Sequence, residues 1–90
     1  MKKQVFVVSL TYFFEGDIDN ETYLFDTYNK AKSFFDTLVE KEKTQTWIAD
    51  YDDVDITHEP DYFHAFENSN YYETSIRIKK QDILWKNTHY

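Results

Sequence analysis

One helical pattern stands among segments with the composition of β-strands, and it constrains the fold more than any other feature. Apolar side chains recur at the spacing i, i+3, i+4, i+7 and i+8, at Ala31, Phe34, Phe35, Leu38 and Val39. This spacing predicts an amphipathic helix over residues 28–43, with Asp26 or Thr27 as its N-cap. A helix with one apolar stripe must bury that stripe against a second layer, and the strands before and after it in the sequence are expected to form this layer.

Two strand-like segments precede the helix. Residues 5–14 are β-branched and aromatic, and apolar side chains lie on both faces of the extended chain, which predicts a central strand. Residues 15–20 predict a turn in which Gly16 or Asn20 adopts a positive φ. Residues 21–25 predict a short second strand that pairs back on the first as a hairpin.

Further strands are expected after the helix. Residues 45–48 fit a third strand, and residues 50–61 fit a short edge strand. Residues 62–67 and 71–79 predict a hairpin, and the second of these segments alternates apolar and polar side chains. The apolar residues within 83–85 are expected to dock the tail of the chain.

With one strand counted between the helix and the final hairpin, the order is β-β-α-β-β-β, without a strand–helix–strand repeat. The sequence therefore predicts one α+β domain over residues 1–90, an antiparallel sheet of four to five strands with one amphipathic helix packed on one face. A chain of 90 residues must build an efficient core, and 8 Phe, 8 Tyr and 2 Trp side chains supply its apolar area. The chain has no cysteine, so disulfides and thiolate metal sites are excluded.

The charge of the chain is strongly acidic and unevenly spread. The formal net charge is −7, and no Lys or Arg lies between Lys43 and Arg77. This charge opposes direct binding to nucleic acid and to anionic membranes, because both require cationic side chains. Residues 1–14 have neither the length of a membrane span nor a signal-peptide cleavage site, which together with the lack of cysteine favours a cytoplasmic location. A basic protein is the partner class that such a chain attracts.

No catalytic, metal or cofactor site is expected. The acidic runs at 17–21 and 50–55 lack the glycine and the final glutamate that an EF-hand calcium loop requires. His58 and His64 do not have the spacing of a helical zinc-binding pair. The sequence places no base beside a nucleophile and has no glycine-rich phosphate loop, so it predicts a non-enzymatic protein without cofactors.

The acidic segment before the predicted hairpin is the candidate functional region, and two interpretations of it stay open. One is a solvated face that keeps a small protein soluble. The other is a docking surface whose carboxylates steer a basic partner and whose tyrosines anchor it. The residues expected in that partner-binding surface are Asp50, Tyr51, Asp52, Asp53, Asp55, Glu59, Asp61, Tyr62 and Tyr71.

The segment LFDTYNKAKSFFDTLVEKEK, after a VFVVSLTYFF strand and before YFHAFENSNYYETSIRI, resembles small proteins of phages and mobile elements. The resemblance covers most of the chain as a pattern of elements and includes no diagnostic motif. It implies an anti-defence protein of the anti-CRISPR type, a class in which several members imitate the charge of DNA. It assigns no role to any individual residue.

The predicted function is that of an acidic stoichiometric inhibitor, in its extreme form a DNA mimic, of a basic nucleic-acid-handling or immune effector protein. The alternative is a small-ligand-binding or sponge protein that has an aromatic pocket and self-associates into a homo-oligomer. Partner binding that weakens steeply with salt favours the first function. A ligand that raises the melting temperature favours the second.

Overall fold

The computed structural model describes residues 2–45, 48, 54–68 and 71–84, and the elements within these ranges form two layers, a sheet and the helix that covers it. The elements are β1 (Lys2–Phe14), β2 (Asp17–Phe25), α1 (Tyr28–Lys43), β3 (Val54–Glu59), β4 (Tyr62–Glu67) and β5 (Tyr72–Leu84). The α+β class, the order of the elements and the bounds of the helix are those predicted from the sequence. Among the described residues, no helix has the length and apolarity needed to cross a membrane.

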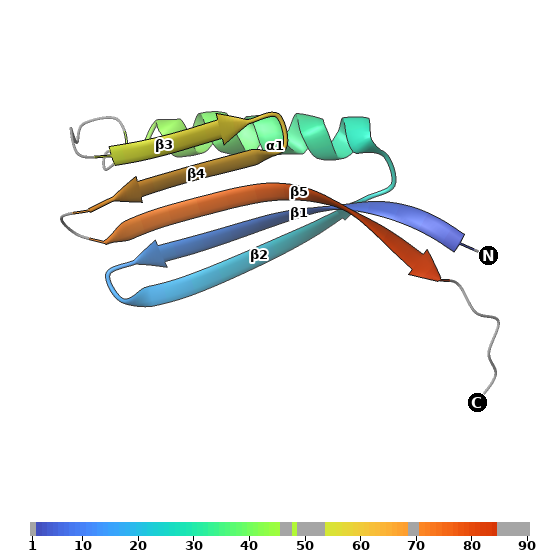
Figure 1. The fold of residues 1–90 in the computed structure, drawn as a ribbon, viewed down its shortest axis with the longest axis horizontal. Coiled ribbons are helices and arrows are strands. Elements are labelled where there is room, and N and C mark those ends of the chain that lie inside the picture. The colour runs from blue at the N-terminus through green and yellow to red at the C-terminus, as the bar shows by residue number, and fades with distance from the viewer. Residues whose placement is uncertain (1, 46–47, 49–53, 69–70, 85–90) are drawn as a thin grey trace.

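The described strands form a single sheet in the order β2-β1-β5-β4-β3, and each neighbouring pair is antiparallel. The first and last strands are thus hydrogen-bonded neighbours, and the other strands lie outside them (Figure 1). β1 and β5 pair from Lys2 opposite Leu84 to Phe13 opposite Glu73. The predicted interior position of the first strand is confirmed, because β1 has a strand on each side.

The hairpin between β1 and β2 is tighter than the sequence suggested. β2 begins at Asp17 rather than at residue 21, so the turn contains only Glu15 and Gly16. Their φ angles are 53° and 86°, and two positive values are what a two-residue type I′ turn requires. Asn20 lies inside β2 opposite Thr11, whose hydroxyl donates to the Asn20 side-chain oxygen at 2.9 Å.

The strand expected over residues 45–48 is absent from the described part of that segment. Gln45 follows the helix C-cap Thr44, and Ile48, whose N–H donates to the Gln45 carbonyl at 3.0 Å, is helical rather than extended. Residues 46–47 lie outside the described residues. The predicted edge strand within 50–61 is β3, which begins at Val54.

The end of the chain also differs from the expected docked tail. β5 continues past residue 79 to Leu84, because residues 79–84 keep pairing with β1. Ile83 and Leu84 therefore belong to the strand, and Trp85 lies outside the described residues.

Local chemistry explains where the helix begins. Thr27, one of the two predicted caps, is the N-cap, and its hydroxyl accepts a hydrogen bond from the Lys30 N–H at 3.2 Å. Lys30 and Lys32 lie at the positive end of the helix dipole, which is unfavourable. Asp26 and Asp36 form ion pairs with them at 3.0 and 3.1 Å, and these pairs offset part of the unfavourable contribution.

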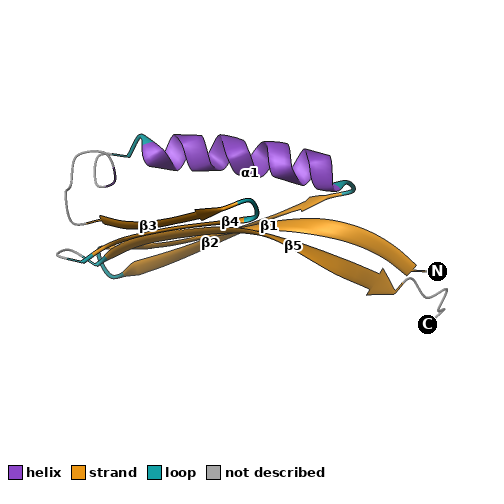
Figure 2. Ribbon diagram, turned by 45° about the horizontal axis from the view of Figure 1, so that its top comes forward, coloured by secondary structure: helices purple, strands orange, loops and turns teal. Residues whose placement is uncertain are grey.

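The apolar stripe of α1 packs on the sheet face that the helix covers (Figure 2). Ala31, Phe35 and Val39 are buried in one cluster with side chains from the three middle strands, namely Val8, Leu10, Phe63, Ala65, Ile76 and Ile78. Phe34 is only half-buried, and its ring lies 4.6 Å from that of Tyr23 and 5.3 Å from that of Phe25 between centroids. The two adjacent phenylalanines thus contact different strands, as their angular separation on a helix predicts.

None of the described elements covers the other side of the sheet, which we call the open face (Figure 2). Along β5, Thr74 and Ile76 are buried toward the helix, whereas Ser75 and Arg77 point the opposite way. The strand register extends this alternation to the neighbouring strands. In β3, β4 and β5 the open face consists of Asp55, Thr57, Glu59, Tyr62, His64, Phe66, Glu73, Ser75, Arg77 and Lys79.

Truncation of an aromatic side chain in the helical stripe should lower the free energy of unfolding, and the loss should be larger for the more deeply buried ring. Phe35→Ala should lower the free energy of unfolding by about 3–5 kcal/mol, because it opens a cavity under the helix. Phe34→Ala should cost less, since that ring is half-buried at β2. Ser33→Ala, on the exposed side of α1, is the control and should stay within about 0.5 kcal/mol of wild type. Urea unfolding measures all three, and equal losses for Phe35→Ala and Ser33→Ala would contradict the packing of the helix.

Candidate functional site

Two of the predicted partner-binding carboxylates lie together on the edge strand β3. Asp55 and Glu59 are exposed, and because they are four residues apart both point to the open face. The register places Asp55 opposite Phe66 and Glu59 opposite Tyr62. Neither carboxylate forms an ion pair within the described part of the chain. Their negative charge is therefore open to solvent or to a partner.

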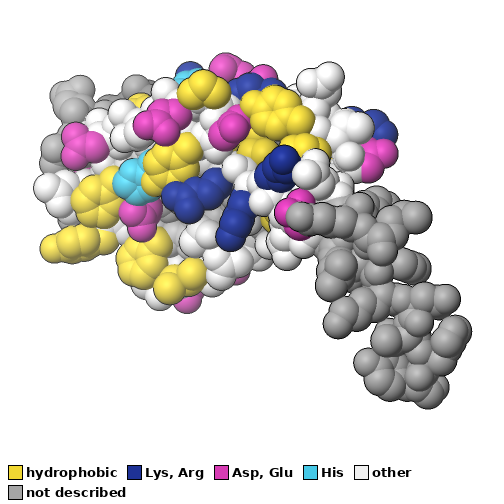
Figure 3. Space-filling model, turned by 45° about the vertical axis from the view of Figure 1, so that its right-hand side comes forward, with side chains coloured by type: hydrophobic (Ala, Val, Ile, Leu, Met, Phe, Trp, Pro, Cys, Tyr) yellow, Lys and Arg dark blue, Asp and Glu magenta, His cyan; other side chains and the backbone are white. Residues whose placement is uncertain are grey.

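Tyr62, a third predicted residue, lies beside these carboxylates and is half-buried. The Arg77 guanidinium lies 4.9 Å from the centroid of its ring, and the His64 imidazole lies parallel to it at 6.2 Å. His64 Nε2 is in turn 2.6 Å from a carboxylate oxygen of Glu73. Figure 3 shows histidine, apolar, basic and acidic side chains side by side on this part of the surface. The open face thus combines the acidic edge of β3 with an aromatic and cationic row.

The structure separates two other predicted residues from this group. Asp61 lies in the turn after β3, and its carboxylate accepts a hydrogen bond from the Tyr28 hydroxyl at 2.5 Å, at the start of α1. Lys32 donates to the carbonyl of the neighbouring Pro60. These contacts give the turn an intramolecular role in holding the helix. Tyr71 is 65% exposed but precedes β5, at the opposite end of the β4–β5 hairpin from Tyr62.

The other predicted residues belong to the segment between α1 and β3. They are Asp50, Tyr51, Asp52 and Asp53, and all four lie outside the described residues. The described part of the predicted surface therefore consists of Asp55, Glu59 and Tyr62 together, with Asp61 and Tyr71 apart.

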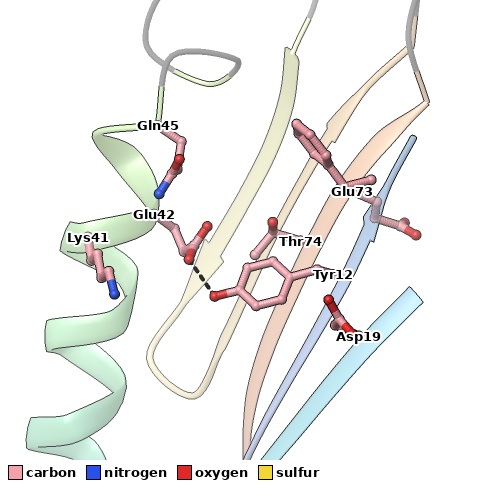
Figure 4. Close-up of a pocket in the computed structure, with 8 residues that line it drawn as sticks. Tyr12, Asp19, Lys41, Glu42, Gln45, Glu73 and Thr74 are labelled. Carbon is pink, nitrogen blue, oxygen red and sulfur yellow. Dashed lines mark hydrogen bonds between the residues drawn. The ribbon is translucent and has the colours of Figure 1, made fainter. Parts of the chain in front are cut away.

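A cavity of about 330 Å³ lies between the C-terminal end of α1 and the sheet (Figure 4). Its lining comes from α1, β1, β2, β5 and the residue after the C-cap, and consists of Tyr12, Phe14, Asp19, Lys41, Glu42, Gln45, Glu73 and Thr74. The volume is at the lower end of the range of about 300–1,000 Å³ that small-molecule sites occupy. The cavity lies on the helix side of the sheet, away from the open face.

Glu42 is the least exposed charged side chain of the cavity, with 2% of its surface accessible. The Tyr12 hydroxyl donates to its carboxylate at 2.8 Å, and the two side chains point toward each other from helix and sheet (Figure 4). Burial raises the pKa of Glu42, and the negative charge of Glu21 adds to this effect. The hydrogen bond from Tyr12 and the positive charge of Lys41 act in the opposite direction.

Tyr12 is perturbed by the same contact. Burial raises the pKa of Tyr12 well above its ordinary value. The hydrogen bond to Glu42 and the negative charge of Glu42 raise this pKa further. The phenol therefore stays protonated and acts as a donor to the carboxylate. Within the described residues, no Lys or Arg forms an ion pair with Glu42. The carboxylate thus has a neutral partner at a buried position.

Neither residue was predicted as a site residue from the sequence, although a signal for both is present. Glu42 follows Phe35 by seven positions and Val39 by three, so it continues the apolar stripe of the helix by one turn. Tyr12 shares its strand face with Val8 and Leu10, which are buried under the helix. A carboxyl group on an apolar stripe needs a hydrogen-bond donor opposite it, and Tyr12 supplies one.

Known proteins give no further indication of what these two sites do. Comparison with protein families, with curated proteins and with solved structures finds no match. In the described ranges of the chain, no three or more His, Asp or Glu side chains are grouped so that they could hold a metal ion. The function of the chain therefore has to follow from the chemistry of the residues described above.

The buried Glu42 should make stability fall as the pH rises. Its folded pKa is above the ordinary value, so between these two values the folded chain binds more protons than the unfolded chain. Stability is then greatest below this window and decreases through it with rising pH. Glu42→Gln removes the ionisation and should flatten this part of the profile. Urea unfolding from about pH 4 to about pH 8 measures the effect.

The matched control for this measurement is Glu40→Gln on the same helix. The Glu40 side chain is 76% exposed, so its removal should leave the pH profile parallel to that of wild type. If Glu42→Gln also ran parallel to wild type, the buried carboxyl would not be the group that couples pH to stability.

Proposed function

We propose that this protein is a non-enzymatic binding protein that docks on a basic protein through the β3 edge of its open face. The observation that supports the proposal is the placement of Asp55 and Glu59, which are exposed, point to one side and have no cationic partner among the described residues. Carboxylates in this arrangement attract a cationic surface at long range and accelerate association.

Charge at a sheet edge also has a simpler role, since it prevents pairing with the edge of another sheet. The aromatic side chains beside the carboxylates support docking over this role. Tyr62 and Phe66 lie directly across from Glu59 and Asp55, on the same face and only half-buried. Tyrosine is enriched among residues that anchor interfaces, because it offers a large rigid surface and a hydroxyl group.

The net charge of −7 favours a basic partner, and the resemblance to anti-defence proteins supports a narrower proposal. The chain acts as a stoichiometric inhibitor of a nucleic-acid-handling or immune effector protein, and its carboxylates take the place of phosphates on the cationic surface of that protein. Nucleic acid and this chain then compete for one surface. The mechanism needs no catalytic residue, since occupancy of the surface is sufficient for inhibition.

Removal of the β3 charges should slow association with the partner. Immobilised protein captures the partner from host lysate, and the kinetics with the purified partner are then measured at two ionic strengths. Asp55→Asn with Glu59→Gln should lower the association rate by about tenfold at low salt and flatten its salt dependence. Asp17→Asn with Asp19→Asn removes the same charge from the opposite edge strand β2 and should retain most of the wild-type rate. Equal effects of the two double variants would contradict docking at β3.

Truncation of Tyr62 should change the rate of dissociation from the partner rather than the rate of association. Tyr62→Ala should accelerate dissociation from the partner by about tenfold or more, because truncation of an interface anchor typically costs about 2 kcal/mol. Tyr71→Ala, at the far end of the β4–β5 hairpin, is the control and should dissociate at the wild-type rate. The same kinetic measurement provides both rates, and an unchanged dissociation rate for Tyr62→Ala would remove it from the interface.

A further inference from the structure

The cavity at the end of α1 has the surroundings of a site for a small cation. Asp19 and Glu42 line it, Glu21 lies close enough to affect the pKa of both Glu42 and Tyr12, and Lys41 is the one cationic side chain among the described lining residues. Glu73 does not add to this charge, because its carboxylate is held by His64 on the other side of the sheet. Figure 4 shows the Glu73 side chain directed away from Glu42.

Two further features of the cavity favour positive charge. The aromatic rings of Tyr12 and Phe14 line it, and the face of an aromatic ring attracts ammonium groups. The helix ends at Lys43, and Lys41 and Glu42 of its last turn line the cavity, so the negative end of the helix dipole lies near it. The carboxylates, the aromatic rings and the helix C-terminus thus all favour a positively charged ligand in the cavity.

Glu42 gives the cavity its specific chemistry. Its carboxyl group is almost completely buried, and the partner that the structure gives it is the neutral Tyr12 hydroxyl. A buried carboxylate without a cation is unfavourable, because the hydrogen bond from a phenol replaces only part of the lost hydration. An ammonium group in the cavity would donate charge-assisted hydrogen bonds to the carboxylate and compensate its charge.

We propose that this cavity binds a small aliphatic amine, with its ammonium group on the Glu42 carboxylate and its alkyl chain against the rings of Tyr12 and Phe14. An anion is disfavoured by the carboxylates, and an uncharged ligand leaves Glu42 uncompensated. A metal ion is disfavoured because the described residues offer no group of three ligands. The site is on the helix side of the sheet, so this inference is independent of the docking surface proposed for the open face.

The test uses putrescine as the probe, with butanediol and butyrate as uncharged and anionic controls of similar length. Two-dimensional NMR of the wild-type chain should show saturable shifts with putrescine at the signals of Tyr12, Lys41, Glu42 and Thr74. The signal of Asp61, in the turn after β3, should not move. The melting temperature should rise with putrescine and stay unchanged with the two controls. Absence of saturable shifts at the cavity, or equal shifts with butanediol, would overturn the proposal.

Variants separate specific binding from general attraction to an acidic chain. Glu42→Gln keeps the shape of the side chain. It should weaken putrescine binding by about ten- to hundredfold, because it removes one charge-assisted hydrogen bond. Glu40→Gln removes an exposed charge from the same helix and should bind like wild type. Equal affinity of the two variants would mean that putrescine only associates with the acidic surface. The shifts mapped on the wild-type chain test the site even if Glu42→Gln does not fold.

The pH dependence of binding provides a second readout. The ionisable groups around Glu42 are Tyr12, Lys41 and Glu21, which act on its pKa, and Asp19 and Glu73, which line the same cavity. Protonation of Glu42 removes the charge that the ammonium group contacts, and the raised pKa of Glu42 places this loss at a higher pH than for an exposed glutamate. Putrescine should bind more weakly at about pH 4 than at about pH 7, and a pH-independent affinity would contradict a contact with Glu42.

Discussion

The burial of one helical stripe on the paired β1 and β5 strands is the interaction on which the rest of the structure depends. Phe35 and Val39 close the core against Val8 and Ile76, which come from the two strands farthest apart in sequence. A single helix covers a single face, so the opposite face of the sheet has no described layer over it. The same packing ends at Glu42, where the stripe continues but the side chain is no longer apolar. The positions of both candidate sites therefore depend on which face of the sheet α1 covers and on where its apolar stripe ends.

The two sites use negative charge in different ways. On β3, Asp55 and Glu59 are hydrated and exposed, so their charge acts at long range and is weakened by salt. At the end of α1, Glu42 is enclosed, so its charge acts at short range on Tyr12 and on a group that enters the cavity, and burial makes such contacts stronger. The first arrangement suits the capture of a large basic surface, and the second suits a small cation. Neither requires the other, since they lie on opposite sides of the sheet.

Much of the fold could be predicted because its signals are local. The stripe fixed the helix at residues 28–43, and the alternation along 72–78 correctly assigned the buried and exposed sides of the last strand. The pairing of β1 with β5 could not be predicted, since it joins the two ends of the chain and no local pattern specifies it. The strand expected at 45–48 was wrong because an apolar residue after a helix can also reach the core in helical conformation, as the buried Ile48 does. Glu42 was missed because an acidic residue near a helix end is ordinarily solvated, and only the tertiary contact with Tyr12 shows that it is buried.

We infer that this chain meets a basic partner at the β3 edge of the open face. Amide hydrogen exchange of the chain, alone and in the purified complex, maps that contact without any substitution. We expect slower exchange in the complex for the amides of Val54–Glu59 and Tyr62–Glu67, with α1 unchanged. Slower exchange confined to α1, with β3 and β4 exchanging as in the free chain, would contradict it.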